Sequence, residues 1–318
     1  MSALHHQGLV IAHLAKRVLV QDLNTGELRL CSARKTLARA GIAPVCNDTV
    51  QYDVSAEGDQ NLQKEGVITA VVERRNRLLR HDERDGTRTL AANIDYLGIV
   101  IAPKPAPDFG LVDRYLIAAT ALNITPIVIL NKVDLLETPY PELLVYEHLG
   151  IRVIHTSAGA TEKDGSNIHE LTQLLDQAHA GLTAILCGQS GVGKSSLTRL
   201  LVNDLAIQES IQVQALSSIE QGQHTTTVAR RYALPSGGAL LDSPGVRDYR
   251  LWALTSAELQ QAFVEFRPYL GQCKYNDCIH HQEPQCAVRT ALAAGDISPR
   301  RYDSYVQLEA WLKPLRVS

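Results

Sequence analysis

A glycine-rich segment between an apolar run and a helix-forming run has the pattern of a phosphate-binding loop. The pattern G-x-x-x-x-G-K-[ST] is met by Gly188-Gln189-Ser190-Gly191-Val192-Gly193-Lys194-Ser195, between LTAILC and KSSLTRLL. These glycines let successive backbone N–H groups surround phosphates at a helix N-terminus, where the helix dipole favours anions. We expect Lys194 to reach the β- and γ-phosphates and act in catalysis, Ser195 to ligate Mg²⁺, and Ser196 to line the nucleotide site. A glycine-rich turn without a ligand is the alternative.

The segment Asn131-Lys132-Val133-Asp134 indicates guanine rather than adenine. The Asp134 carboxylate can accept hydrogen bonds from the ring N–H and the exocyclic amine of guanine, and adenine has no such donor pair. We expect Asn131 and Lys132 to hold the loop and flank the base. An aspartate that caps a turn after a strand is the alternative.

A second base motif, Ser157-Ala158, ends the next predicted strand. The Ala158 N–H could bind the guanine O6, although a plain turn would have the same sequence. Because the two motifs end successive strands, they are predicted to meet at one edge of a sheet, where open α/β sheets bind ligands.

Two further segments are predicted to contact Mg²⁺ and the γ-phosphate. Asp242-Ser243-Pro244-Gly245 follows an apolar strand; we expect Asp242 to hold Mg²⁺ through water and the Gly245 N–H to sense the γ-phosphate, with a β-turn as the alternative. We call this segment switch two. In QGQHTTTVARRY, here switch one, Thr225 and Thr226 are candidates to cap Mg²⁺ and the γ-phosphate; the threonines could instead begin a strand.

Near the C-terminus, three thiols and one imidazole lie within fourteen residues: Cys273, Cys278, His280 and Cys286. Soft ligands in this number suit a tetrahedral structural Zn²⁺ without an open coordination position. His281 is an alternative imidazole ligand, and cysteines without a metal are the alternative to a site. The cysteines at 31, 46 and 187 lack such spacing and are predicted to be core or surface thiols.

Three segments are predicted to position these residues. Residues 1–90 contain short β-rich stretches typical of an OB-like β-barrel, with an SH3-like barrel as the alternative. Residues 91–250 alternate strands and helices, which predicts an α/β P-loop GTPase domain with a parallel sheet covered on both faces. Residues 251–318 are predicted to form a helical zinc-binding domain.

The guanine motifs precede the phosphate loop, whereas GTPases ordinarily present the phosphate loop first. The order here is base motif, second base motif, phosphate loop, switch one, switch two, which is the ordinary order cut after switch two and rejoined. A sheet tolerates this when the old termini lie close together at the surface. We interpret residues 91–250 as a circularly permuted GTPase domain. Because switch two leads into the C-terminal domain, we hypothesise that its movement reorients that domain through the chain connection.

The permuted order, GQSGVGKSSL, GQHTTT, DSPGVRDYRLW and the Cys/His cluster together resemble the ribosome small-subunit-dependent GTPase A family. The resemblance covers about residues 90–318, and the barrel in outline. It implies an OB barrel, a permuted domain that binds GTP and GDP, and a zinc domain with His280 as ligand, acting in late small-subunit maturation. The chain departs from the family at Asn47-Asp48-Thr49-Val50, where Gly-Asp-Arg-Val is usual; this difference bears on RNA contact at that loop.

The residue that orients the attacking water in Ras-type enzymes follows the glycine of D-x-x-G. Here that residue is Val246, which has no polar atom. His224, beside the threonines of switch one, is the predicted replacement because an imidazole nitrogen can accept a hydrogen bond from water. The family resemblance points to the same histidine. A solvent-exposed loop histidine is the alternative.

The net charge of −3, with 45% apolar and 20% charged residues, is ordinary for a soluble globular protein. RNA contact would therefore come from local patches. Candidates are six arginines between Glu73 and Arg88 and the group Arg300, Arg301, Tyr302 and Tyr305; a solvated strand and helix packing, respectively, are the alternatives.

We find no apolar run of membrane-spanning length and no secretory signal, and expect a cytoplasmic monomer. The expected cofactors are GTP or GDP, Mg²⁺ and one structural Zn²⁺; the expected partners are the small ribosomal subunit and its rRNA, with no membrane. The first hypothesis is a GTP hydrolase stimulated by the small subunit, whose RNA contacts are gated by the nucleotide. The second is a guanine-nucleotide-gated RNA- or protein-binding adaptor with incidental hydrolysis. The Asn131-Lys132-x-Asp134 motif argues against an ATP-dependent kinase.

Overall fold

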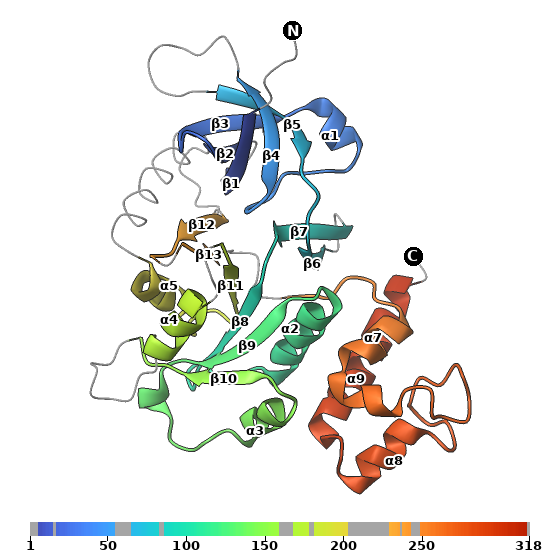
Figure 1. Cartoon of the computed structure of the whole chain (residues 1–318). Helices are drawn as coiled ribbons and strands as arrows, with labels where there is room; N and C mark the ends of the chain where they lie inside the picture. Colours follow the sequence, from blue (N-terminus) through green and yellow to red (C-terminus); the bar gives the residue numbers. More distant parts are fainter. Residues whose placement is uncertain are drawn as a thin grey trace.

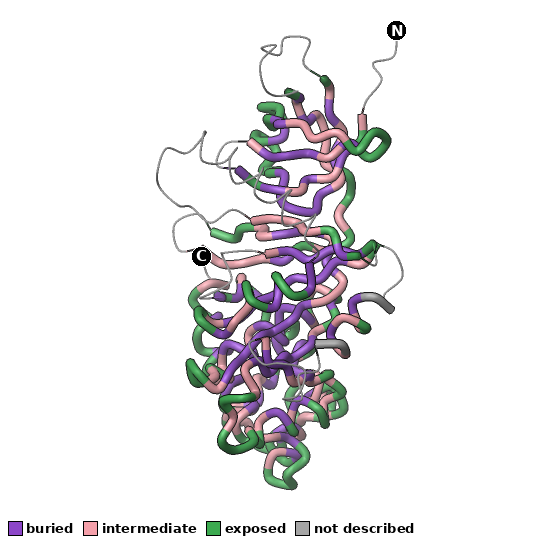
Figure 2. Tube along the Cα trace, turned by 90° about the vertical axis from the view of Figure 1, so that its left-hand side faces the viewer, coloured by how far each residue is buried: buried purple, intermediate pink, exposed green. Residues whose placement is uncertain are grey.

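A β-barrel, an α/β sheet and a helical segment follow one another in space as they do in sequence (Figure 1). The computed structural model describes residues 6–14, 17–54, 65–82, 86–158, 168–177, 181–202, 229–235, 237–242 and 249–316. Figure 2 shows buried residues along the strands of both β-structures, with exposed residues on turns and outer helices.

The N-terminal strands form a closed five-stranded barrel. Its elements are β1 (His6–Leu14), β2 (Arg17–Asp22), β3 (Leu28–Ala33), α1 (Lys35–Arg39), β4 (Thr49–Val54) and β5 (Glu65–Val71). The strand order is β1-β2-β3-β5-β4, and β4 pairs back with β1. Only β3 and β5 are parallel among these pairs. This order, with a helix between β3 and β4, is that of an OB fold, which confirms the predicted OB-like barrel over the SH3-like alternative.

Buried and more exposed residues alternate along the barrel strand β1, so that one face of the strand lines the barrel interior. In β1 the buried residues are Gly8, Val10, Ala12 and Leu14, so every second side chain faces inward. Val10 packs with Tyr52 and Ile68 in one apolar core of the barrel. The hairpin of β6 (Arg77–Asp82) and β7 (Gly86–Ala92) forms a separate two-stranded sheet between the barrel and the α/β part.

The α/β part contributes six strands, in the order β10-β9-β8-β11-β13-β12, to a sheet that continues into the barrel, because β12 pairs antiparallel with β1. The strands are β8 (Tyr96–Ile101), β9 (Thr125–Leu130), β10 (Arg152–His155), β11 (Thr183–Cys187), β12 (Arg230–Ala233) and β13 (Ala239–Asp242). All pairs are parallel except β12 with β13. The strand β11 lies between β8 and β13, so the sheet is continuous although its central strand comes late in the sequence. This is the arrangement that a circular permutation requires.

Helices cover both faces of this sheet. One face packs against α2 (Phe109–Ala121) and α3 (Pro141–His148), through residues such as Leu116 and Tyr146. The other packs against α4 (Ile168–Gln177) and α5 (Lys194–Leu201), through Leu171 and Leu197. With both faces covered, the strands are continuous apolar runs, as in the four buried residues that end β9.

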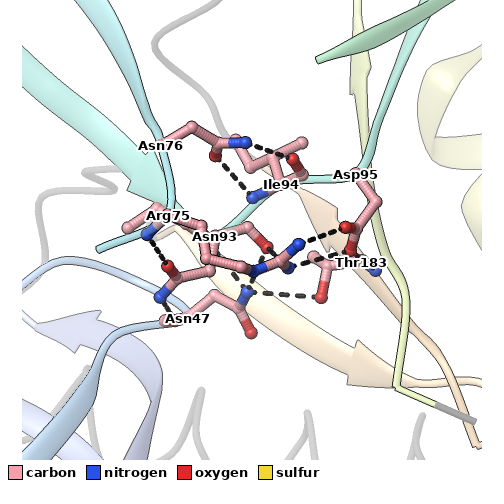
Figure 3. Close-up of polar contacts among 8 residues, drawn as sticks. Asn47, Arg75, Asn76, Asn93, Ile94, Asp95 and Thr183 are labelled. Atoms are coloured by element: carbon pink, nitrogen blue, oxygen red, sulfur yellow. Dashed lines mark hydrogen bonds and ion pairs between the residues drawn. The ribbon is translucent and has the colours of Figure 1, made fainter. Parts of the chain in front are cut away.

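The barrel is joined to the α/β part through the side chain of Asn47 (Figure 3). Its Nδ2 donates to the carbonyl oxygens of Ala92 and Asn93, at 3.1 Å each, and to the Thr183 hydroxyl at 3.2 Å. Its Oδ1 accepts from Arg231 Nε at 3.0 Å. Asn47 has a φ of 70°, in the left-handed region that asparagine tolerates better than most residues, which explains why it can replace a glycine here.

Residues near Asn47 also bind one another within the junction. Asp48 is fully buried and binds Arg74 through two contacts of 2.7 Å. Arg75 binds Asp95 at 2.6 Å, and Asp95 accepts from the Thr183 N–H (Figure 3). Asn47 and Asp48 therefore face the domain junction rather than an external RNA.

The C-terminal segment is helical, as predicted. Its elements are α7 (Ser256–Ala262), α8 (Ala287–Ala294), α9 (Pro299–Leu312) and short 3-10 turns at Val264–Tyr269 and Pro314–Arg316. The helix α7 begins with a capping box, in which Thr255 and Glu258 each bind the other's backbone N–H. In the described part of the chain, no helix combines the length and the apolar character that a membrane crossing requires.

Buried ion pairs fix α9 on the α/β part. Arg301 is 1% exposed and binds Asp113 of α2 at 2.8 Å and Glu265 at 2.7 and 3.0 Å. Arg300 also binds Asp113, at 2.8 Å, and lies over the ring of Tyr146. The two arginines thus hold the helical segment in place, and the fully buried Tyr305 packs in the core rather than toward RNA.

We predict that Asp113→Ala destabilises the protein by about 3–5 kcal/mol, because two guanidinium groups would lose their shared carboxylate and one of them is fully buried. Urea unfolding measures this loss. Asp303→Ala, an exposed carboxylate on the same helix as Arg301, is the matched control and should change stability little. Equal stability of the two variants would show that the Asp113 pairs do not hold the interface.

Candidate nucleotide site and metal centre

The predicted phosphate loop connects the buried strand β11 to α5 at the carboxyl edge of the sheet. Gly188 has a φ of +132°, and a Cβ there would lie 2.1 Å from the Val100 carbonyl oxygen. Gly193 has a φ of +98°, and its Cβ would lie 2.2 Å from Asn131 Nδ2. Only glycine fits these two positions, because both the backbone conformation and the space exclude a side chain.

The loop has the polarity that a phosphate group needs. Lys194 Nζ donates to the carbonyl oxygens of Gly188 and Gln189, at 2.8 and 2.6 Å, so the ammonium group lies within the loop. Ser195 and Ser196 are exposed in the first turn of α5, and Ser190 and Gly191 are exposed at the tip of the loop. The loop can therefore offer a cation, a helix N-terminus and hydroxyl groups to an anion.

Asn131 connects the phosphate loop to both predicted base motifs. Its side chain is 1% exposed, and its Nδ2 donates to the Val192 carbonyl at 2.9 Å. Its Oδ1 accepts from the Thr156 hydroxyl at 3.1 Å and from the Ala158 N–H at 3.2 Å. One carboxamide thus joins three chain segments that are separated by up to 61 residues. In this arrangement the Ala158 N–H, predicted to bind guanine O6, is directed at Asn131.

The other residues of the base motifs lie around Asn131. Lys132 has a left-handed backbone, with a φ of 60°, and its Nζ donates to the carbonyl oxygens of Gly191 and Lys104 at 2.6 and 2.9 Å. Asp134 is exposed, and its Oδ1 accepts a short hydrogen bond from the buried Ser157 hydroxyl. An exposed carboxylate held by a buried hydroxyl can accept hydrogen bonds from a ligand at this edge.

Asp242 ends β13, directly beside Leu186 of the central strand. This register places Asp242 at the carboxyl end of its strand, two residues along the neighbouring strand from the start of the phosphate loop at Gly188; its role in holding Mg²⁺ stays a prediction. The remaining predicted residues of the nucleotide site, His224, Thr225, Thr226 and Gly245, lie outside the described residues, as does Val246.

Sequence reasoning did not single out Thr156, which is fully buried and binds Asn131 through its hydroxyl. Its position directly before Ser157 was the only available signal. It also did not identify the cis peptide between Lys104 and Pro105, in the segment whose carbonyl binds Lys132.

The predicted metal ligands converge in the C-terminal segment. The ligand atoms of Cys273, Cys278, His280 and Cys286 lie within 4.8 Å of one another. His280 Nδ1 is 3.5, 3.4 and 3.3 Å from the three sulfur atoms, in that order, and Cys273 Sγ is 3.9 Å from Cys286 Sγ. Tetrahedral zinc, with bonds of about 2.3 Å to sulfur and 2.0 Å to nitrogen, separates its ligand atoms by about 3.5–3.8 Å. The cluster therefore fits such an ion.

Geometry favours His280 over His281 as the nitrogen ligand, because His280 Nδ1 is the imidazole nitrogen grouped with all three sulfur atoms. Burial lowers the pKa of His280, which favours the neutral imidazole that binds a metal. The φ of 61° at His280 accompanies the turn that directs Nδ1 at the sulfur atoms. Cys31, Cys46 and Cys187 are buried elsewhere, as expected of core thiols.

Comparison with known proteins agrees with this architecture. The family model for the RsgA GTPase matches residues 71–252. The small ribosomal subunit biogenesis GTPase RsgA 1 of Vibrio parahaemolyticus serotype O3:K6 (strain RIMD 2210633) is 42% identical over 306 residues, covering 94% of this chain and 82% of the relative. RsgA of Proteus mirabilis (strain HI4320) is 37% identical over 317 residues, covering 98% and 86%.

Two solved structures are similar over nearly the whole chain. YjeQ from Thermotoga maritima has a TM-score of 0.67 and 28% identity, covering 98% of this chain and 99% of that protein. YloQ, described as a circularly permuted GTPase, has a TM-score of 0.64 and 26% identity, covering 98% and 95%. The permuted sheet, the phosphate loop on β11 and these matches lead to one conclusion: the chain belongs to the RsgA GTPase family and is a GTPase.

Proposed function

We propose that this GTPase acts in maturation of the small ribosomal subunit, is stimulated by that subunit, and contacts its rRNA in a manner gated by the bound nucleotide. The observation that carries the chemistry is the Asn131 carboxamide, which joins a glycine-rich loop to both base motifs. The biological setting is supported by the relatives, which are named small ribosomal subunit biogenesis GTPases.

The proposed roles follow from the positions of the residues. The loop from Gly188 to Ser196 holds the phosphates, and Lys194 neutralises charge that develops during transfer. Ser195 and Asp242, together with Thr225 or Thr226, would hold Mg²⁺, which would neutralise negative charge on the phosphates. Asp134, Lys132 and Ala158 read and flank the guanine. From the sequence, Gly245 senses the γ-phosphate and His224 orients water.

Fewer of the six arginines between Glu73 and Arg88 are candidates for RNA contact than the sequence indicates. Arg74 and Arg75 bind Asp48 and Asp95 within the domain junction. We propose phosphate contact for Arg77, an exposed residue at the start of the hairpin strand β6. Structural Zn²⁺ on the Cys₃His cluster would stabilise the C-terminal segment, without a role in hydrolysis.

GTP turnover with and without purified small subunits tests the proposal directly. We expect stimulation by the subunits, and a further dependence of co-sedimentation on GDP versus a GTP analogue. Equal turnover in both conditions, with nucleotide-dependent binding retained, would favour an adaptor whose hydrolysis is incidental.

We predict that Asp134→Asn lowers affinity for GTP by about 100-fold, because two hydrogen bonds to a carboxylate are lost. The same change should raise affinity for xanthosine nucleotides, since the carboxamide offers a donor to the altered base. Titration with fluorescent nucleotides measures both. Glu137→Gln, an exposed acid three residues away, is the control. Unchanged GTP affinity of Asp134→Asn would remove Asp134 from the base site.

We predict that Cys278→Ser loses bound zinc and lowers the melting temperature, because a structural metal contributes folding free energy directly. Metal content and thermal unfolding are the measurements. His281→Ala replaces the neighbouring imidazole and should retain about one zinc per chain. If Cys278→Ser keeps its zinc, or if His281→Ala loses it, the ligand set is wrong.

We predict that His224→Ala leaves nucleotide affinity nearly intact but lowers subunit-stimulated turnover by about tenfold or more, the usual scale for a positioned acid–base group. Turnover at saturating GTP with small subunits present measures this effect. His148→Ala, exposed on α3, should behave as wild type. Wild-type turnover of His224→Ala would exclude a catalytic role for this histidine.

A further inference from the structure

The barrel contains a pocket of about 380 Å³, lined by residues of β1, β2, β3, α1 and the loop that follows α1. This volume lies in the range of pockets that hold small molecules or parts of larger ligands. None of the lining residues belongs to the nucleotide site or to the metal centre. The pocket is therefore a feature of the barrel that GTP binding does not explain.

The lining of this pocket is mostly apolar. Val18 and Cys31 are 5% and 0% exposed and belong to the barrel core. They pair directly across β2 and β3, so their side chains lie on the same face of the barrel wall. The helix and its loop contribute Ala38, Ile42 and Pro44. A lining of this kind can bury the face of a flat ring.

The loop at residues 41–44 is fixed by hydrogen bonds. The Ile42 N–H donates to the Leu37 carbonyl oxygen at 2.9 Å, which closes the end of α1. The Ala43 carbonyl oxygen accepts from Arg74 at 2.7 Å, and Arg74 also binds the fully buried Asp48. Because this wall is held by the barrel itself, a ligand would not have to order it, which lowers the cost of binding.

The charges around the pocket favour an anionic ligand. Arg17 lines the pocket and forms a partly exposed ion pair with Glu65 at 2.8 Å. His13 adds an imidazole, which can hydrogen-bond to a base or stack on it. The helix α1 carries the exposed Lys35 and Arg39 and no acidic residue. The three cations thus outnumber the one carboxylate.

We propose that this pocket binds one unpaired nucleotide of RNA, with the base within the apolar lining and a phosphate near Arg17. The inference rests on the proposed rRNA contact of this GTPase and specifies one place for it. Single-stranded RNA is bound by proteins that bury splayed bases against side chains and hold the backbone with cations, and this pocket offers both. An apolar side chain of a protein would use the lining but not the cations.

The variant Ala38→Trp tests the base, because the larger side chain occupies the pocket. It should weaken the binding of a short fluorescein-labelled oligoadenylate or oligouridylate by about tenfold, the usual scale for loss of one buried base. Ala40→Trp is the matched control, since Ala40 is exposed at the end of the same helix and outside the lining. An abasic RNA of the same length should bind wild type and both variants alike, because it has no base to insert.

The variant Arg17→Gln tests the phosphate and changes the pocket volume little, so it remains informative if Ala38→Trp does not fold. It should weaken oligonucleotide binding by about threefold and reduce the dependence of log affinity on log salt by about 0.7, the value for one phosphate contact of a single strand. Arg152→Gln breaks a comparable partly exposed ion pair, with Glu170, and should leave both quantities unchanged.

These measurements separate failure of the pocket from failure of the proposed function. Wild type that binds neither oligonucleotide, or Ala38→Trp that binds them as wild type does, would overturn the pocket. If Ala38→Trp keeps oligonucleotide binding but no longer co-sediments with small subunits, the pocket receives a protein and not RNA. A wild-type protein that fails to co-sediment with small subunits would instead overturn the proposed function, whatever the oligonucleotides show.

Discussion

The nucleotide edge of this protein depends on one buried carboxamide. Asn131 donates to Val192 of the phosphate loop and accepts from Thr156 and Ala158 of the second base motif. A buried amide that lost one of these partners would leave another polar group without water or protein to bind, so the three segments are constrained together. Gly193 permits this contact, because any side chain there would occupy the position of Asn131 Nδ2. The contact joins these segments although both base motifs precede the phosphate loop in the chain.

A second buried amide has the corresponding role between domains. Asn47 binds residues that lie 45, 136 and 184 positions away, and thereby connects the barrel to the start of β11 and to β12. Its positive φ explains why a family position usually occupied by glycine accepts asparagine but few other residues. Compared with glycine, asparagine adds a side chain that fills the junction between the barrel and the α/β part. The same burial excludes this residue from any external RNA surface.

Local patterns predicted the parallel sheet, the phosphate loop and the metal cluster, because each depends on contiguous residues such as GQSGVGKS or on closely spaced ligands. The pairing of strands that are distant in the sequence could not be predicted from such patterns. The choice between OB and SH3-like barrels depends on the parallel pairing of β3 with β5 and on closure of β4 on β1. Likewise, Arg301 is a basic residue of the type that contacts RNA phosphates. Only its contact with Asp113, 188 positions away, shows that it holds the C-terminal helices on the α/β part.

Residues in or next to both proposed switches bind the N-terminal half of the molecule. The carbonyl oxygen of Ala229, a described residue of switch one, accepts from the His13 N–H of barrel strand β1 at 3.2 Å. Arg250, after switch two, binds His81 of the hairpin. By contrast, the C-terminal helices are fixed on α2 through buried ion pairs at Asp113. A movement of switch two that reoriented the C-terminal segment would have to break those ion pairs. The barrel is anchored as well, because the buried Asn47 carboxamide binds Ala92, Thr183 and Arg231. Both appended segments are therefore held on the α/β part by buried polar contacts, and reorientation of either one requires such contacts to break.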